Sequence, residues 1–265
     1  MDIFVWPEVA RRQAAGQLPT PFGLERFQIL MWADEGRKPQ VLLNEEVEIV
    51  AHVKLTTSDL IAADGSVPLA AIERVNRITP VNEPNAAHAT FFQLNGSYHL
   101  VFDFTYNRAR ATDRLVRAEE FFAGAQSEID AGRLCTCVEL LWSCAELAAI
   151  AILLTVPDPD MLTKKSQNHK ARREKFEAHG KLNFPAHATL VKTAEAHRAP
   201  ARYLEGEVPD ETELRGLLED ARGLIEYAHR RLRPIGEPED DASETASSTV
   251  SGVGPSKGIS GAALQ

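Results

Sequence analysis

The amino-acid sequence predicts an α+β fold, in which a strand-rich N-terminal domain with an antiparallel hairpin precedes an all-α, up-and-down helical bundle. Two observations support this prediction. Apolar and polar residues alternate within residues 47–55 and 88–106, as they do in half-buried strands, whereas beyond Asp113 the apolar residues recur at helical spacing. We therefore expect domains at residues 1–112 and 113–235, followed by a disordered tail at 236–265.

The N-terminal domain carries its clearest local pattern at Asn95 and Gly96, which separate two runs of apolar and aromatic residues. Both central positions of a type I′ turn need positive φ, and Asn-Gly satisfies that need. The pattern predicts a two-residue β-hairpin. Residues 47–55 predict a further half-buried strand, and residues 7–15 are compatible with a short helix.

The C-terminal region predicts five helices. The first begins at Asp113, which can cap it, and ends at Gly132. The others are expected at residues 134–155, 160–179, 185–204 and 211–232. The connections are short, which favours antiparallel neighbours and an up-and-down topology. Residues 236–265 have few large apolar side chains, too few to offset the entropy of ordering.

Net charge, cysteine content and the longest apolar run exclude several classes of protein. The net charge of -9 is spread over both domains and the tail, which argues against a general duplex-binding protein. Three cysteines do not form a disulfide framework, and no cysteine spacing fits a metal site, so we expect reduced thiols in a cytoplasmic protein. The longest apolar run contains Glu146 and is shorter than the ~20 residues that span a bilayer. No metal, other cofactor or membrane contact is expected.

The apolar helix at residues 134–155 contains two acidic residues, Glu139 and Glu146, which lie two turns apart on one face. A carboxylate that faces a bundle interior is costly unless a cation compensates it. We therefore expect Glu146 to pair with an arginine from another helix, and Arg198 is the candidate. Glu139 is expected either at a wet or edge position or in a functional role, and the same two alternatives, a structural ion pair or a functional role, hold for Glu146.

Two cationic segments are candidate binding sites. Near the end of the fourth helix, Pro200 should bend the chain where Arg198, Arg202 and Tyr203 project. A run rich in lysine and arginine precedes it. Such a run is commonly a solvated helix face, but it can also track phosphates. The candidate nucleic-acid or nucleotide-binding residues are Lys164, Lys165, His169, Lys170, Arg172, Arg173 and Arg202.

The run from Arg198 to Tyr203 resembles the Arg-x-x-Ala-x-Tyr form of the motif carried by HEPN-domain proteins. Residues 143–153 are similar to the aliphatic helix with an embedded glutamate in that family, and residues 169–173 to a polar stretch before its bundle turns back. The resemblance covers about 120 residues of the C-terminal half.

The resemblance implies a dimeric helical domain, common in prokaryotic toxin–antitoxin and antiphage systems, and often a metal-independent endoribonuclease. In active members an arginine holds the scissile phosphate and a histidine transfers the proton. Here Tyr203 occupies the position of that histidine, and a tyrosine hydroxyl is a weak general base at neutral pH. The catalytic candidates are Arg198, Tyr203 and Glu146.

The implied partners are a second copy of the chain, an RNA or a nucleotide, and a protein bound through the N-terminal domain. The alternative is a non-catalytic dimeric interaction module in which Glu146 and Arg198 form a purely structural pair. The sequence leaves both interpretations open.

Overall fold

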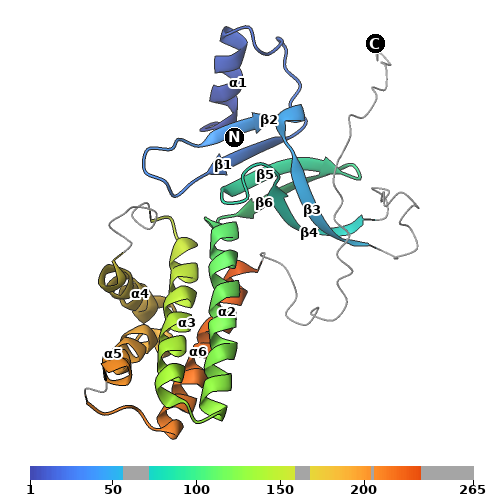
Figure 1. Cartoon of the computed structure of the whole chain (residues 1–265). Helices are drawn as coiled ribbons and strands as arrows, with labels where there is room; N and C mark the ends of the chain where they lie inside the picture. Colours follow the sequence, from blue (N-terminus) through green and yellow to red (C-terminus); the bar gives the residue numbers. More distant parts are fainter. Residues whose placement is uncertain (56–71, 159–167, 204–205, 234–265) are drawn as a thin grey trace.

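A computed structural model describes residues 1–55, 72–158, 168–203 and 206–233 of the chain (Figure 1). Antiparallel sheet occupies the N-terminal part, and the helices α2 to α6 occupy the C-terminal part. This arrangement confirms the predicted α+β fold. The tail expected at residues 236–265, Lys164, Lys165 and the expected start of the third bundle helix at Asp160 lie outside the described residues.

The main sheet is antiparallel and has the strand order β2-β1-β5-β6. The predicted hairpin is confirmed: Leu94 lies opposite Ser97, and Asn95 and Gly96 have φ values of 50° and 76°. A separate antiparallel pair, β3 and β4, contains the strand expected at residues 47–55. The strands are β1 (Phe27–Met31), β2 (Gln40–Leu43), β3 (Ile49–Leu55), β4 (Ile72–Pro80), β5 (Ala87–Leu94) and β6 (Ser97–Asp103).

Helix α1 (Val5–Ala14) covers one face of the main sheet (Figure 1). Its buried residues Val5 and Val9 pack with a set of alternating sheet residues. The alternation places residues from one face of β1, β2 and β5 in this small core. The sheet residues of this core are Phe27, Ile29, Val41, Leu43 and Ala89.

The opposite face of the sheet contains a buried polar network. Gln28 donates a hydrogen bond to Thr90 Oγ1 over 2.8 Å, and His88 Nε2 lies 3.0 Å from the carbonyl oxygen of Ile78 on β4. A carbonyl can only accept, so Nε2 carries the proton and donates. Burial lowers the pKa of His88. The neutral imidazole therefore joins the two sheets.

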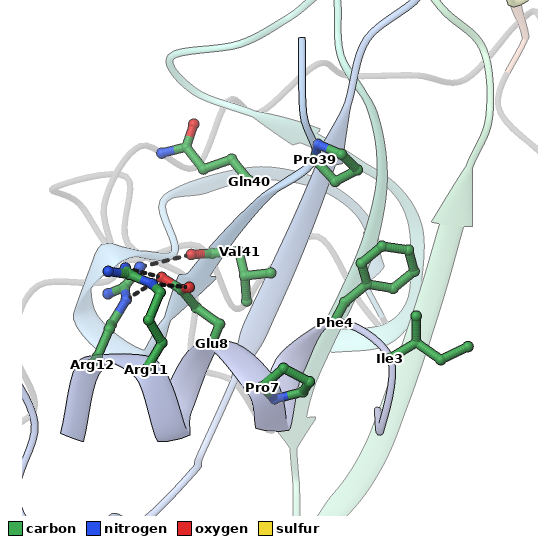
Figure 2. Close-up of a pocket in the computed structure, with 9 residues that line it drawn as sticks. All are labelled: Ile3, Phe4, Pro7, Glu8, Arg11, Arg12, Pro39, Gln40 and Val41. Carbon is green, nitrogen blue, oxygen red and sulfur yellow. Dashed lines mark hydrogen bonds and ion pairs between the residues drawn. The ribbon is translucent and has the colours of Figure 1, made fainter. Parts of the chain in front are cut away.

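A surface hollow of about 520 Å³ lies between α1 and the start of β2 (Figure 2). Its polar wall is an ion-pair group: the Glu8 carboxylate accepts from Arg11 and Arg12, and Arg12 also donates to Glu46 and to the Val41 carbonyl. Carboxylates already compensate both guanidinium groups, so we interpret this group as a clamp between α1 and β2.

Because of this clamp, the free energy of unfolding at acidic pH depends on the protonation of Glu8. The hydrogen bond from Arg11 holds the pKa of Glu8 at about 2, below the ordinary 4.5. A depressed carboxyl pKa stabilises the fold above the unfolded value, and that contribution is lost as the pH falls from 4.5 through about 2. We expect Glu8→Gln to flatten this part of the curve of unfolding free energy against pH. A variant with the wild-type slope would contradict the assignment.

The bundle is built around α3, which packs against α2, α5, α6 and α4. By length and composition α3 could cross a membrane, but 67% of its most apolar window is buried inside the bundle, as in the core helix of a soluble protein. Burial also raises the pKa of Cys137 to about 11 and of Cys144 to about 12, so both thiols stay protonated. The helices are α2 (Arg108–Asp130), α3 (Leu134–Leu154), α4 (His169–Asn183), α5 (Leu190–Tyr203) and α6 (Glu211–Leu232).

Helix α2 begins at Arg108, five residues before the predicted cap Asp113. Asn107 precedes it in the left-handed region at φ 49°, and its side-chain amide donates to the Leu154 carbonyl at the end of α3. Tertiary contacts therefore start the helix early. Asn168 caps α4 by accepting from the Lys170 amide, and this helix continues to Asn183, beyond the predicted end at residue 179.

Candidate functional site

The candidate site lies on one stripe of α3, where Glu139, Trp142 and Glu146 follow one another at helical spacing. This stripe faces the start of α4 and the end of α5. Trp142 is buried at its centre, with one carboxylate on each side of it. Three helices therefore contribute side chains to what we call the Trp142 cluster, whose members are Glu139, Trp142, Glu146, His169, Arg172, Arg198 and Arg202.

Helix α5 supplies two arginines, one turn apart, to the Glu139 end of the cluster. The Arg198 guanidinium carbon lies 3.8 Å from the centroid of the Trp142 ring, in the range of a cation–π contact. Arg198 Nε and Arg202 Nη2 both donate to Glu139 Oε2, over 3.1 and 2.6 Å. The hydrogen bond to Glu139 raises the pKa of Arg202. Arg198 is thus held in place by an aromatic face and a carboxylate.

Helix α4 supplies the partners of Glu146, at the other end of the stripe. His169 Nδ1 is hydrogen-bonded to Glu146 Oε1, and Arg172 Nη1 lies 3.5 Å from the same oxygen. The His169 ring centroid is 5.5 Å from that of Trp142. The Glu146 side chain is only 13% exposed, whereas that of His169 is 58% exposed. An exposed imidazole is therefore oriented by a largely buried carboxylate.

The predicted pair between Glu146 and Arg198 is wrong. Glu146 pairs with His169 and Arg172, and Arg198 pairs with Glu139. The carboxylates lie two turns apart on α3, and each meets the helix end that packs at its own level. The expectation that a carboxylate on this apolar helix needs a cation is nevertheless confirmed. Glu139 is also not at a solvated edge, because two arginines cover it.

The structure brings five of the proposed site residues together and leaves others outside. Glu146, His169, Arg172, Arg198 and Arg202 all belong to the Trp142 cluster. Tyr203 follows Arg202 at the end of α5 and is exposed. Arg173 pairs with Glu195 between α4 and α5, and Lys170 is exposed beside His169.

The sequence analysis did not identify Trp142 as part of the site, and it did not identify Glu139 as the partner of Arg198 and Arg202. The available signal was their spacing with Glu146, which places an aromatic ring between two carboxylates on one helix face. This pattern alone does not show which cations approach, because those lie 23 to 63 residues further along the chain than the carboxylates they meet.

The arrangement suits an anionic ligand. Three guanidinium groups face two carboxylates, so positive charge is in excess. Within the described residues only Nε of Arg198 makes a hydrogen bond, so its two terminal nitrogens can still donate in a planar fork. Glu139 Oε1 is buried and finds no donor in the described part of the chain. The described residues contain no group of His, Cys, Asp and Glu side chains that could hold a metal ion.

Comparisons with known proteins do not extend this picture. Neither a scan against protein-family models nor a search of curated proteins finds a match to the chain. The geometry of the Trp142 cluster and the motif in α5 are therefore the features that bear on function.

Proposed function

We propose that this chain is a HEPN-like, cytoplasmic RNA-binding protein of a prokaryotic defence, toxin–antitoxin or stress system, with metal-independent endoribonuclease activity. The observation that supports it is that two helices bring cationic side chains and an imidazole to one stripe of α3. Arg198 and His169 contact the Trp142 indole, and Arg202 and Arg172 contact the flanking carboxylates. Cations for the phosphate and an imidazole for the proton are the groups that such cleavage uses.

Arg198 is the phosphate-holding residue in this proposal. The indole face and the Glu139 carboxylate restrict its side chain, so little further ordering is needed when a ligand binds. Its terminal nitrogens can donate in parallel to two oxygens of a phosphodiester. Arg202 lies one turn further along α5 and adds positive charge for a neighbouring phosphate.

His169 supplies the general base that the motif in α5 lacks. Glu146 accepts from Nδ1–H, which leaves Nε2 as the acceptor nitrogen on an exposed ring. The ribose 2′-hydroxyl gives its proton to Nε2 and its oxygen attacks phosphorus. The bond to the 5′-oxygen breaks, and that oxygen takes a proton from water. The products are a 2′,3′-cyclic phosphate and a 5′-hydroxyl, and Tyr203 is not needed as a base.

The test is cleavage of labelled single-stranded RNA by the purified full chain in EDTA. We expect Arg198→Ala and His169→Ala each to lower the rate by roughly 100-fold or more, the scale set by loss of an oxyanion-stabilising donor or a general base. Arg117→Ala, which removes an exposed arginine of α2, is the matched control and should cleave normally. Equal rates for wild type and both site variants would contradict the proposal.

The alternative is the non-catalytic interaction module, and the sharing of Glu139 by two arginines favours it, because those ion pairs also hold the bundle together. The variant Glu139→Gln distinguishes an RNA-binding cluster from a purely structural one. If the cluster binds phosphate, removal of this negative charge should tighten RNA binding several-fold at low salt. If the pairs are only structural, the variant should lose stability and wild type should not bind RNA.

A further inference from the structure

The other prominent surface of the molecule is the outer strand of the main sheet. β6 pairs with β5 alone among the described strands, so one of its edges is open. Three alternate residues of this strand, Tyr98, Leu100 and Phe102, are 70%, 49% and 46% exposed, and Phe104 follows them at 54%. The ring of Phe104 stacks on that of Phe102. An exposed apolar stripe therefore runs along an edge strand.

The stripe continues the apolar face of the sheet beyond the cover of α1. Leu100 lies opposite Phe91 on β5, and Phe91 lies opposite Phe27 on β1, which is buried in the α1 core. The ring of Phe91 also stacks on Tyr98, with centroids 5.5 Å apart. α1 lies over the β2 and β1 side of the sheet, away from β6 (Figure 1). One hydrophobic face is thus half covered and half open.

The backbone of β6 is equally available. In a two-residue hairpin the residues that flank the turn, here Leu94 and Ser97, form a hydrogen-bonded pair, and such pairs then alternate along the ladder. The amide and carbonyl groups of Tyr98, Leu100 and Phe102 consequently point to the open edge. The strand has no lysine, proline or bulge at these positions, which are the usual devices that keep edge strands from pairing.

We propose that a second copy of this chain pairs with β6 in antiparallel register, on a two-fold axis at Leu100. The pattern of β6 is complementary to itself about that residue. Tyr98 meets Phe102 of the partner subunit, Leu100 meets its own copy, and both pairs lie on the apolar face, where aromatic and aliphatic cross-strand pairs are stabilising. Asp103, the only charged residue of the strand, meets Ser97 of the partner subunit, so no like charges are opposed.

The position of the strand in the molecule also favours this pairing. β6 runs toward α2, so the bundle lies beyond its C-terminal end (Figure 1). Antiparallel pairing of two β6 strands places the two bundles at opposite ends of one continuous sheet. The proposed self-association surface is therefore in the sheet, at the end of the molecule away from the bundle helices that cover α3.

The size of the patch indicates a weak, concentration-dependent dimer. The four side chains of the stripe leave on the order of 400 Å² open in each chain, which is the scale of the largest apolar patches on monomers. Pairing of two copies buries at most roughly twice that apolar area, which is below the ~1,200 Å² of standard interfaces and in the range of weak ones. The inference is independent of the proposed RNA chemistry.

Light scattering on the full chain at increasing concentration tests the pairing. We expect the wild-type mass to rise from monomer to dimer in the micromolar range. Leu100→Lys places two like charges opposite each other on the axis and should remain monomeric at every concentration. Val116→Lys, an equivalent change at a half-exposed valine of α2, should dimerise like wild type. A monomeric wild type, or a Leu100→Lys chain that still dimerises, would overturn the proposal.

Crosslinking gives a second measurement that does not depend on how Leu100→Lys folds. In a hydrogen-bonded antiparallel pair the two Cα atoms are about 5.5 Å apart, within the range that a disulfide bridges. Leu100→Cys should therefore form a covalent dimer on mild oxidation, faster than Val116→Cys and faster than wild type with its three native cysteines. Equal crosslinking of the three proteins would exclude the two-fold register at Leu100.

Discussion

Arg108→Ala should lower the free energy of unfolding by about 3 kcal/mol, because it leaves a largely buried carboxylate without its cation. Arg108 Nη2 lies 2.5 Å from Asp103 Oδ2, and the two side chains are 9% and 14% exposed. Arg108 Nη1 also donates to the Leu232 carbonyl near the end of α6. A single guanidinium group therefore joins the end of β6, the start of α2 and the end of α6.

Urea unfolding of Arg108→Ala against Arg117→Ala measures this effect. Arg117 also lies on α2 and pairs with Glu120, but both side chains are more than half exposed. Exposed pairs of this kind contribute about 0.5 kcal/mol or less, so the control should unfold almost as wild type does. Asp103→Asn combined with Arg108→Gln should recover part of the loss, because neither charge is then left unpaired. Equal losses for Arg108→Ala and Arg117→Ala would show that the junction is not held by this pair.

The same junction shows why sequence patterns placed the start of α2 too late. Asp113 is a good capping residue, and the apolar helical periodicity begins just after it. The first turn of the helix, however, is formed by polar residues whose partners are distant: Asn107 contacts the end of α3, and Arg108 contacts β6 and α6. Local periodicity does not contain such long-range contacts.

Among the strands too, those defined by nearby residues were predictable, and those defined by partners far along the chain were not. The hairpin of β5 and β6 was predictable because Asn95 and Gly96 encode its turn within a few residues. β1 and β2 were not predicted, since β1 is a short apolar run whose main partner, β5, lies about 60 residues away. β4 was also not predicted. Its apolar residues Ile72, Val75 and Ile78 recur every third residue instead of alternating, and its pairing with β3 is interrupted by register shifts.

At the candidate site, the sequence predicted that Glu146 needs a cationic partner, but it did not predict which residue that partner is. The cost of burying Glu146 in an apolar helix correctly required a cation, but three arginines and a histidine were available. Which of them meets Glu146 depends on where α4 and α5 cross α3, and that is a property of the packed bundle. His169 was predicted as a ligand-binding residue, and its hydrogen bond to Glu146 makes it the candidate base.

Gly180→Ala should destabilise the protein by roughly 2 kcal/mol, although alanine is the better helix former. A Cβ atom at Gly180 of α4 would lie 2.8 Å from Phe184 Cε2, 2.9 Å from Ala188 Cβ and 3.0 Å from Ala188 Cα. The Phe184 ring cannot easily move, because it packs on Phe176 and Tyr227 at centroid distances of 5.1 and 4.7 Å. The backbone at Ala188 is also too close, so α4 itself would have to shift.

Gly216→Ala is the matched control, and it should change stability in the opposite direction. Gly216 lies in α6 and is exposed, and a Cβ atom there would meet no neighbouring atom of the described residues within 4 Å. The substitution removes only the excess backbone freedom of glycine in the unfolded chain, which is worth about 0.5–1 kcal/mol of added stability. Both variants can be compared in one urea series. A Gly180→Ala protein as stable as Gly216→Ala would mean that α4 does not pack tightly on the turn at residues 184–188. His169 and Arg172 would then lack the rigid support that the Trp142 cluster requires, because both side chains are carried by α4.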